Sequence, residues 1–251
     1  MHDRNFDELH DRFQKNIYQN IKGEVRSRVI QHHVERHILE LAQGPLSCAD
    51  IGAGFGQFSE FLAERGHHVD YFEISQKMTA SARNGISEKL HSLIQFHCVP
   101  FQQGLAETYD FINCQAVLEW LADPDHALAL FARHLRPDGV LLLMFYNESS
   151  IKMRNLILGN LNAAQNGYKG IGGGLTPPNP QSIEAVFSKL KKLNFSIDHW
   201  FGVRCFTDFQ QRTARERLGA DALVEHEIPV SYLDPFRSMA RYIGVVARLK
   251  S

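Results

Sequence analysis

Apolar and polar positions along the chain follow two different spacings. Short apolar runs predict buried strands, and segments with apolar residues three or four positions apart predict amphipathic helices. The first part of the chain contains five apolar runs, at residues 46–51, 67–74, 92–99, 109–117 and 139–147. Helical patterns separate most of these runs, and the last run is apolar throughout, as expected of a central strand in a parallel sheet. This order predicts a doubly wound α/β sheet.

The segments on either side of these runs predict more helices and two more strands. Residues 6–41 predict two helices, and Gly44-Pro45 ends the second one. After the fifth run we predict a helix at 151–164, a loop at 166–180 and a second helix at 182–195. A strand at 195–206, a helical stretch at 207–241 and a last strand at 242–250 follow. We expect the loop to be mobile because it is rich in glycine and proline.

The composition adds a few restrictions. The chain has 251 residues, of which 44% are hydrophobic, so one large domain with a substantial core is expected. Its formal net charge of -1 argues against binding nucleic acid through overall charge. The four cysteines form no C-x-x-C pair, so we predict neither a zinc ribbon nor a disulfide framework. The N-terminus does not resemble a signal peptide and no apolar run could span a bilayer, so we expect a cytoplasmic protein without membrane contact.

Three closely spaced glycines follow the first apolar run. The segment Gly52-Ala53-Gly54-Phe55-Gly56-Gln57 lies between a predicted strand and a predicted helix, where glycines let a nucleotide-like ligand approach the backbone. A dinucleotide-binding loop has the pattern G-x-G-x-x-G, but Gln57 occupies the position of its last glycine. Asp50 precedes the loop, where it would repel a pyrophosphate and attract the cationic amino group of a methionine. Both features favour S-adenosylmethionine over NAD.

Other candidate cofactor residues end the remaining predicted strands, because ligands of open α/β sheets lie beyond the carboxyl ends of the strands. Glu73 ends the second strand and would accept hydrogen bonds from ribose hydroxyls, unless it is only an exposed carboxylate. We expect the adenine near Phe101 and Gln102, unless Phe101 belongs to the core. The methionine portion is expected near Gln115, at the end of the fourth strand.

From the predicted strands and the candidate cofactor residues at their ends, we predict a single domain, 1–251, with the Rossmann-like fold of class I methyltransferases. Its seven-stranded sheet would be mostly parallel, with an antiparallel last strand that follows a helical insert. Residues 1–44 would form an N-terminal helical cap, residues 45–147 the cofactor-binding half and residues 148–251 the substrate-side half.

Several segments spread over nearly the whole chain point to one family. They are DRNFDELHDRFQKNIYQNIKGEVR, DIGAGFGQ, AVLEWLADPDHAL, LRPDGVLLLMFYN, GNLNAAQNG and GVRCF. Through them the chain resembles the bacterial tRNA 5-carboxymethoxyuridine methyltransferases. The glycine loop and LRPDGVLL are shared by many class I methyltransferases, whereas the N-terminal segment, MFYN and GVRCF are more specific. The resemblance implies methyl transfer from S-adenosylmethionine to the carboxylate of 5-carboxymethoxyuridine, at the wobble position in the anticodon arm of tRNA.

The resemblance also implies roles for individual residues. Arg26 matches an arginine that contacts the cofactor, and Gly52 and Ala53 match the glycine loop. Glu73 and Gln115 stand where a family member has aspartate and histidine, and the loop at 99–102 is one residue longer here. The expected cofactor residues are Arg26, Asp50, Gly52, Ala53, Gly54, Gly56, Glu73, Phe101, Gln102 and Gln115.

The implied chemistry needs few catalytic groups. A carboxylate is already a nucleophile and a sulfonium is an activated methyl donor, so the enzyme has mainly to align the reacting atoms. We therefore expect neither a catalytic acid–base residue nor a metal. A cation should hold the substrate carboxylate, and arginine suits this role because its fork binds two oxygens. Arg204 is the first candidate, unless it is a surface arginine, and the other candidates are Arg26, Lys22 and Arg154.

Recognition of the uridine and the tRNA backbone needs further groups. Tyr18, Tyr146 and Asn147 are candidates for stacking on the base or hydrogen-bonding to it, although Tyr146 also suits a core position. Trp120 better suits packing between helix and sheet. Basic residues that could contact phosphates, if they are not simply a solvated face, are Lys15, Lys22, Arg212, Arg215 and Arg217.

Two observations limit these expectations. His33 and His37 stand four residues apart on a predicted helix, but with no H-E-x-x-H pattern and no third ligand nearby in the sequence we expect no metal site. The long loop of the family carries a lysine-rich run, whereas this chain has Lys169 alone there, so tRNA would be held differently or more weakly. The alternatives are a methyltransferase for a small-molecule carboxylic acid or other metabolite, a non-catalytic S-adenosylmethionine-binding module, and an NAD-linked oxidoreductase.

Overall fold

The computed structural model describes residues 5–9, 20–165 and 177–250. The predictions for Tyr18, Lys15, Lys169 and most of the loop at 166–180 therefore lie outside the described residues. Within the described part of the chain, no helix is long and apolar enough to cross a membrane.

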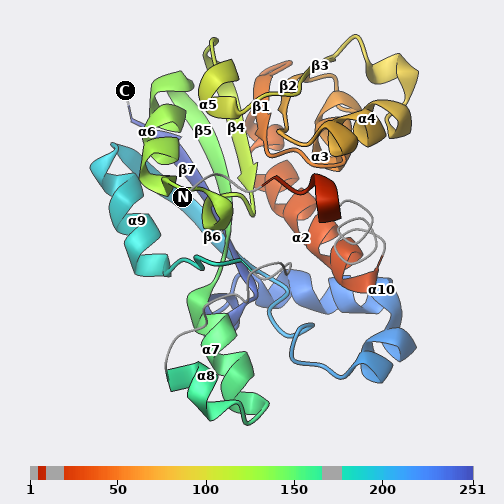
Figure 1. Ribbon diagram of the computed structural model, residues 1–251, viewed down its shortest axis with the longest axis vertical. Coiled ribbons are helices and arrows are strands. Elements are labelled where there is room, and N and C mark those ends of the chain that lie inside the picture. Colours follow the sequence, from red (N-terminus) through yellow and green to blue (C-terminus); the bar gives the residue numbers. More distant parts are fainter. Residues whose placement is uncertain (1–4, 10–19, 166–176, 251) are drawn as a thin grey trace.

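A seven-stranded sheet forms the centre of the molecule, in the order β3-β2-β1-β4-β5-β7-β6 (Figure 1). The strands are β1 (Ser47–Ile51), β2 (His68–Phe72), β3 (Ile94–His97), β4 (Tyr109–Gln115), β5 (Leu135–Tyr146), β6 (Phe195–Val203) and β7 (Tyr242–Leu249). Strands β1 to β5 pair in parallel, and β7 is antiparallel to both of its neighbours, β5 and β6. The predicted sheet, mostly parallel with an antiparallel last strand, is confirmed.

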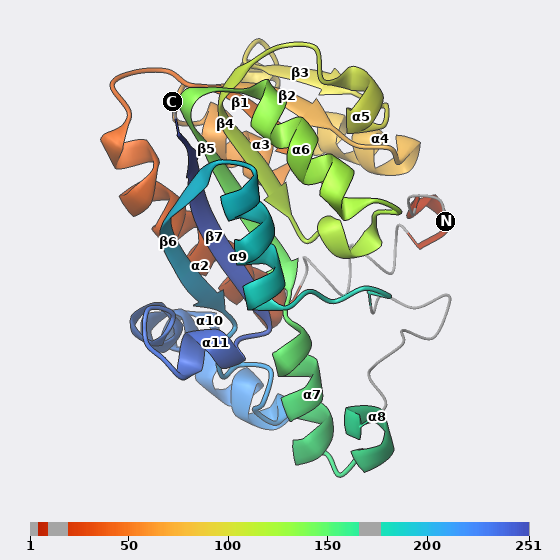
Figure 2. The ribbon, with the colours of Figure 1, turned by 90° about the vertical axis from the view of Figure 1, so that its left-hand side faces the viewer.

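Helices cover both faces of this sheet, so the fold has three layers (Figure 2). Helices α2 (Ile21–His37), α3 (Gln57–Ala63) and α4 (Gln76–Gly85) contribute to the apolar cluster on one face. Helices α5 (Phe101–Gly104), α6 (Pro124–His134) and α9 (Ile183–Lys192) contribute to the cluster on the other face. Along β5, Leu142 and Met144 belong to the first cluster and Leu141 and Leu143 to the second, because successive side chains of a strand point to opposite faces.

Capping residues set the starts of two of these helices. The Ser75 hydroxyl accepts a hydrogen bond from the Met78 N–H at 3.1 Å, as the predicted N-cap of α4 requires. Asp123 caps α6 in the same way, and Pro124 occupies the first helical position. Helix α6 ends at His134 rather than at the predicted Pro-Asp-Gly stop, because β5 already begins at Leu135 and the extra residues form an irregularity in its pairing with β4.

Short 3₁₀ helices complete the first part of the fold, namely η1 (Asp7–Leu9), η3 (Leu39–Leu41), η4 (Glu88–Leu90) and η5 (Leu118–Trp120). The predicted helical insert before the last strand contains α10 (Arg212–Val230) and α11 (Phe236–Met239), and α10 packs against α2. Helix α10 is broken at Gly219, whose φ of 76° is not helical.

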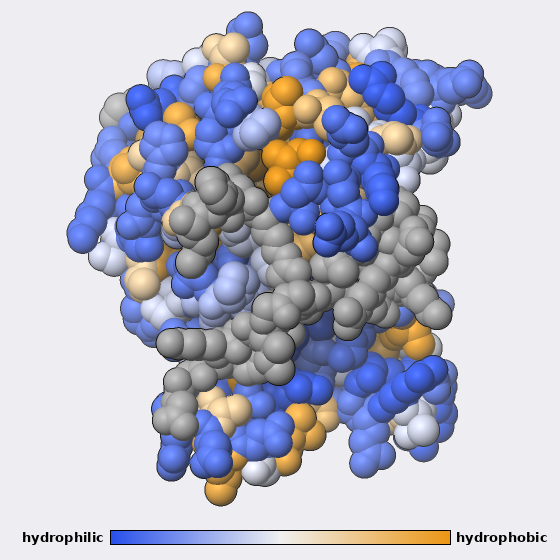
Figure 3. All heavy atoms as spheres, in the orientation of Figure 1, coloured by the Kyte–Doolittle hydropathy of each residue, from blue (hydrophilic) through white to orange (hydrophobic). Residues whose placement is uncertain are grey.

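The helix predicted over 151–164 is a pair of helices, α7 (Glu148–Ile157) and α8 (Leu161–Gln165), that projects from the end of the sheet (Figure 1). Hydrophobic side chains gather at this end of the surface in Figure 3. The large hydrophobic residues exposed there are Met153, Leu156, Ile157, Leu158 and Leu161. This pair of helices therefore exposes several apolar side chains.

One edge of the sheet collects the predicted site residues. All strands except β7 run in one direction, so their carboxyl ends lie at the same edge, together with the start of β7. At this edge Tyr146 of β5 pairs with Tyr242 of β7, which pairs with Val203 of β6. The loop after β1 and the turns that follow β6 and precede β7 therefore face the same side of the molecule.

Candidate cofactor and substrate site

The glycine loop after β1 depends on glycine for its backbone shape. Gly52, Gly54 and Gly56 have φ values of 64°, 58° and 74°, in the left-handed region that other residues rarely adopt. The Ala53 N–H donates to the Phe72 carbonyl at 3.0 Å, which ties the loop to the end of β2. The loop thus lies at the edge of the sheet where a ligand would be bound.

Glu73 supports this loop from the end of β2. Its carboxylate accepts hydrogen bonds from the Gly54 N–H at 3.0 Å and the Ser75 N–H at 2.9 Å. The side chain is buried, so the alternative of an exposed strand-end carboxylate is wrong. Burial raises the pKa of Glu73, while the backbone donors act in the opposite direction. A carboxylate has about four acceptor positions, so Glu73 can still accept a hydrogen bond from a ligand hydroxyl.

Two adjoining hollows lie over the loop. The first has a cavity volume of about 110 Å³ and the second of about 60 Å³. They share Arg26, Gly52 and Gln115 as lining residues. The first is also lined by Phe6, Gly54, Phe72, Glu73, Ile74, Met78, Val99, Phe101, Gln102, Ala116, Val117, Trp120 and Leu121. The second is also lined by Ser27, Ile30, Asp50, Ile51, Ala53, Gln57, Phe58, Asn113 and Met144.

The lining brings together nine of the ten residues expected to bind the cofactor. The exception is Gly56, which lines neither hollow. A Cβ at Gly56 would lie 2.7 Å from Ile86 Cδ1 and 3.1 Å from Ala82 Cβ, so this glycine allows α3 to begin close to α4. The structure thus gives Gly56 a packing role, and its contact with the cofactor stays a prediction.

Asp50 lies beneath the loop and is 1% exposed. Its two oxygens accept hydrogen bonds from Ser59 Oγ and Asn113 Nδ2, both at 2.6 Å. Burial raises the pKa of Asp50 to about 6, against the lowering effect of these hydrogen bonds. Gln115 Nε2 in turn donates to Asn113 Oδ1 at 2.9 Å. A hydrogen-bonded row thus runs from Asp50 to Gln115 along the floor of the second hollow, and no sequence pattern indicated Asn113.

An aromatic pair forms part of the wall of the first hollow. The rings of Phe6 and Trp120 meet edge to face at a centroid distance of 5.0 Å. Trp120 therefore lines the ligand site, whereas the sequence suggested packing between helix and sheet. Phe101 both lines this hollow and packs against Phe131 at 5.5 Å, so its core and cofactor roles coincide.

Glu119, next to Trp120 in η5, points into the protein and is 1% exposed. Its Oε2 atom has no hydrogen-bond partner among the described residues. Burial raises the pKa of Glu119 to about 8, so the carboxyl is mainly protonated at neutral pH.

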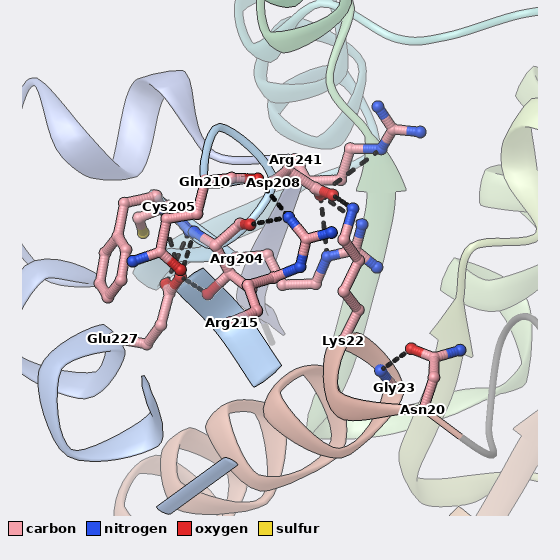
Figure 4. A network of polar contacts seen from close by, with 12 residues as sticks. Asn20, Lys22, Gly23, Arg204, Cys205, Asp208, Gln210, Arg215, Glu227 and Arg241 are labelled. Atoms are coloured by element: carbon pink, nitrogen blue, oxygen red, sulfur yellow. Dashed lines mark hydrogen bonds and ion pairs between the residues drawn. The ribbon is translucent and has the colours of Figure 1, made fainter. Parts of the chain in front are cut away.

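A cluster of cations surrounds one carboxylate at the same edge of the sheet (Figure 4). Asp208 accepts hydrogen bonds from Arg204 and from Lys22 Nζ, the latter at 2.5 Å, and Arg241 Nε lies 3.9 Å away. Burial alone would raise the pKa of Asp208, but the charges of Arg204 and Lys22 outweigh it and lower that pKa. Three cations around one carboxylate leave a surplus of positive charge. We call Lys22, Arg204, Asp208 and Arg241 the cationic cluster.

The members of the cationic cluster differ in how they are engaged. Arg204 is buried, has a φ of 61° and uses Nε and Nη2 on Asp208, so the alternative of a surface arginine is wrong. Arg241 Nε is buried without a hydrogen-bond partner among the described residues, and its guanidinium lies 4.1 Å from the centre of the Tyr146 ring. Arg241 is therefore the better candidate to hold an incoming carboxylate, and sequence reasoning missed it.

Glu227 of α10 fixes the turn that carries Arg204. Its carboxylate accepts hydrogen bonds from the N–H groups of Cys205, Phe206 and Thr207 and from the Thr207 hydroxyl. Arg215, a predicted phosphate contact, instead donates to the carbonyls of Thr207 and Gln210. The cationic cluster is thus built on a firmly bonded turn.

Two predicted substrate contacts have internal roles. Asn147 is 0% exposed, and its side chain caps α7 and donates to the carbonyls of Ser238 and Ala240, both at 2.9 Å. The prediction that Asn147 binds the uridine is therefore wrong, because its amide is fully used inside the protein. Tyr146 is 4% exposed and belongs to the core, as its alternative interpretation proposed.

The remaining basic candidates lie on the surface. Arg154 is exposed on α7 and Arg217 is exposed on α10. Arg212 is exposed as well and forms an ion pair with Glu216 at 2.6 Å. None of these three belongs to the cationic cluster.

Comparisons with known proteins agree with this geometry. A family model described as a methyltransferase domain matches residues 49–143. The magnesium protoporphyrin IX methyltransferase from Synechocystis PCC 6803, solved with bound SAH, shares the fold with a TM-score of 0.64 at 18% identity, over 98% of this chain and 96% of that chain. The fold and the site together define a Rossmann-like methyltransferase, a class that takes its methyl group from S-adenosylmethionine.

One relative extends the match to nearly the whole chain. The tRNA 5-carboxymethoxyuridine methyltransferase of Escherichia coli (strain K12) is 35% identical over 253 residues, which cover 99% of this chain and 97% of the relative. The ubiquinone biosynthesis O-methyltransferase of Aeromonas salmonicida (strain A449) is 31% identical, but over 44% of this chain and 47% of the relative. The chain belongs to the family of tRNA 5-carboxymethoxyuridine methyltransferases. This membership confirms the resemblance and excludes the NAD-linked oxidoreductase.

Proposed function

We propose that this protein transfers a methyl group from S-adenosylmethionine to the carboxylate of 5-carboxymethoxyuridine in the anticodon arm of tRNA. The observation that carries the proposal is the position of helix α2 between two sites. Arg26 of α2 lines both hollows, and Lys22, one helical turn earlier, belongs to the cationic cluster. Residues four apart lie on the same face of a helix, so one helix supplies cations to a cofactor site and to an anion site.

The two hollows suit the two halves of the cofactor. The first is lined by apolar and aromatic side chains such as Phe72 and Phe101 and by Glu73, a setting for adenine and a ribose diol. The second is smaller and contains Asp50, whose negative charge suits the amino group of the methionine portion. Arg26, Gly52 and Gln115 lie where these halves would join, which is the region of the sulfonium.

The residues of this chain would act by binding and orientation. The substrate carboxylate is itself the nucleophile, so no side chain has to remove a proton. The surplus positive charge of the cationic cluster would attract the carboxylate, and Arg241 offers hydrogen-bond donors to it. Holding the oxygen in line with the methyl group then supplies the rate enhancement that proximity and orientation allow. A tRNA substrate would also place the enzyme in the cytoplasm.

The direct test uses the purified full-length chain with S-adenosylmethionine and tRNA that carries 5-carboxymethoxyuridine. Nucleoside mass spectrometry should detect the methyl ester, and tRNA that carries unmodified uridine at the same position should give no product. If a panel of small carboxylic acids is methylated while the modified tRNA is not, the substrate is a metabolite. If neither is methylated although S-adenosylhomocysteine binds, the protein is a binding module.

A further inference from the structure

Three histidines from two elements meet on the side of α2 that faces β6. His33 and His37 are one turn apart on α2, and His199 comes from β6. One ring nitrogen of each lies within 4.8 Å of a ring nitrogen of the other two. His199 is 166 residues from His33 in the sequence, which explains why the sequence offered no third ligand.

The hydrogen bonds around His33 determine which of its nitrogens carries the proton. The Ser231 hydroxyl donates to the Ile228 carbonyl at 2.6 Å, so its oxygen must accept the hydrogen bond from His33 Nε2 at 2.7 Å. His33 Nδ1 therefore carries a lone pair, which accepts a hydrogen bond from His199 Nε2 at 3.1 Å. A partner that fixes the protonated nitrogen of an imidazole is typical of metal-binding histidines.

The spacing of these nitrogens suits a small tetrahedral ion. Bonds of about 2.0 Å from a zinc ion to imidazole nitrogens place neighbouring ligand atoms about 3.3 Å apart. The His33–His199 pair already has nearly this separation. His37 Nε2 lies 3.4 Å from the Tyr232 hydroxyl, and its ring stacks on His199 at 3.9 Å, so His37 has to rotate to complete the set. His37 and His199 are half-buried, which leaves room for that rotation and a path for an ion, whereas His33 is buried against Phe201.

We propose that His33, His37 and His199 bind one divalent transition-metal ion of the zinc type, with water in the fourth position. Three neutral imidazoles without a carboxylate favour zinc, cobalt or nickel over magnesium or calcium. On binding, His199 gives up its Nε2–H and carries its proton on Nδ1, so the ring stays neutral and His33 needs no change. The ion would fasten α2 to β6.

The surroundings of these three rings disfavour the charged form of the imidazole. Burial lowers the pKa of His33 to about 2 and that of His199 to about 4, and it also lowers the pKa of His37. The charge of Arg237 lowers the pKa of His199 further, and Arg36 lowers that of His37, where Glu40 acts in the opposite direction.

The test is titration of the metal-free full-length chain with Zn²⁺ by calorimetry and with Co²⁺ by visible absorption. We expect one ion per chain, a tetrahedral Co²⁺ spectrum and a higher melting temperature with Zn²⁺. Ser231→Ala should weaken binding by about 10–100-fold, the range for a residue that orients a metal-bound histidine. His37→Gln and His199→Gln should weaken it at least as much, because each removes a ligand.

The matched control is His226→Gln, which alters an exposed histidine on α10 and should leave binding unchanged. Circular dichroism and S-adenosylhomocysteine binding would show that each variant is folded. Absence of stoichiometric Zn²⁺ binding by the parent chain would overturn the proposal. Folded His37→Gln and His199→Gln variants that bind Zn²⁺ as tightly as the parent would also overturn it. Methyl transfer to tRNA is a separate readout, so failure of the proposed function would not be confused with either result.

Discussion

Replacing Gly52 by alanine tests the glycine loop at the point where the two hollows meet. The residue has a φ of 64°, and a Cβ built there would lie 2.5 Å from Val117 Cγ2. The substitution therefore combines backbone strain with a steric overlap against a residue that lines the first hollow. Gly66→Ala is the matched control, because Gly66 has a φ of 82° but nothing within 4 Å of its Cβ position.

These two effects can be given separate magnitudes. A left-handed conformation costs about 1–2 kcal/mol for an L-residue, and both variants should lose this much free energy of unfolding. Overpacking adds about 1–3 kcal/mol, which applies to Gly52→Ala alone. If the displaced Val117 side chain narrows the first hollow and this costs a similar free energy of binding, affinity for S-adenosylhomocysteine falls by roughly 5–150-fold, since 1.4 kcal/mol is a factor of ten.

Urea denaturation measures the first quantity and calorimetry with S-adenosylhomocysteine measures the second. Adding Val117→Ala to Gly52→Ala removes the overlapping methyl and should return the stability toward that of Gly66→Ala. The reasoning fails if Gly52→Ala binds S-adenosylhomocysteine as tightly as Gly66→Ala does, because the loop would then not be the surface that the cofactor approaches.

Three further predictions follow from the buried charges. Glu73→Gln should weaken S-adenosylhomocysteine binding by about 1.5–3 kcal/mol for each lost charged hydrogen bond, and calorimetry showing no change would contradict its ribose role. Arg241→Gln should raise KM for modified tRNA by at least about ten-fold while S-adenosylhomocysteine affinity stays constant, and Arg136→Gln, at the opposite edge of the sheet, should leave both unchanged. Glu119 has a folded pKa near 8 against an ordinary value of 4.5, so its contribution to stability is present below pH 4.5 and lost as the pH rises toward 8. Linkage gives a loss of about 3.5 kcal/mol in the free energy of unfolding between pH 5 and pH 8, which Glu119→Gln should abolish. Urea denaturation at both pH values measures this loss, and the same pH dependence in both proteins would refute the prediction.

Local patterns were sufficient to predict most of the fold. Apolar runs, the N-cap at Ser75 and the glycine loop depend on neighbouring residues, so the strands, the start of α4 and nine residues that line the two hollows could be predicted from the sequence. Pairings between distant residues could not be. The contact of Phe6 with Trp120 and the pairing of Lys22 with Asp208 join residues more than a hundred positions apart.

The same limitation explains the errors at the substrate side. Asn147 follows a strand end, which is a typical ligand position. Its side-chain amide instead donates to the carbonyls of Ser238 and Ala240. Arg241 carries no motif of its own, and its position beside Tyr146 follows only from the antiparallel pairing of β7 with β5. Sequence patterns identify which strands end at the site, whereas side-chain partners come from packing.

The carboxylate of Glu227 has a consequence for the speed and tightness of substrate capture. Three consecutive backbone N–H groups after β6 form an anion-binding site, and the Glu227 carboxylate of the same chain occupies it. The turn is thereby shaped before any ligand arrives, and Arg204 is held in its unusual backbone conformation without help from tRNA. A receptor whose binding groups are already in place loses little conformational entropy on association, so affinity here should depend on charge and fit rather than on ordering of this turn.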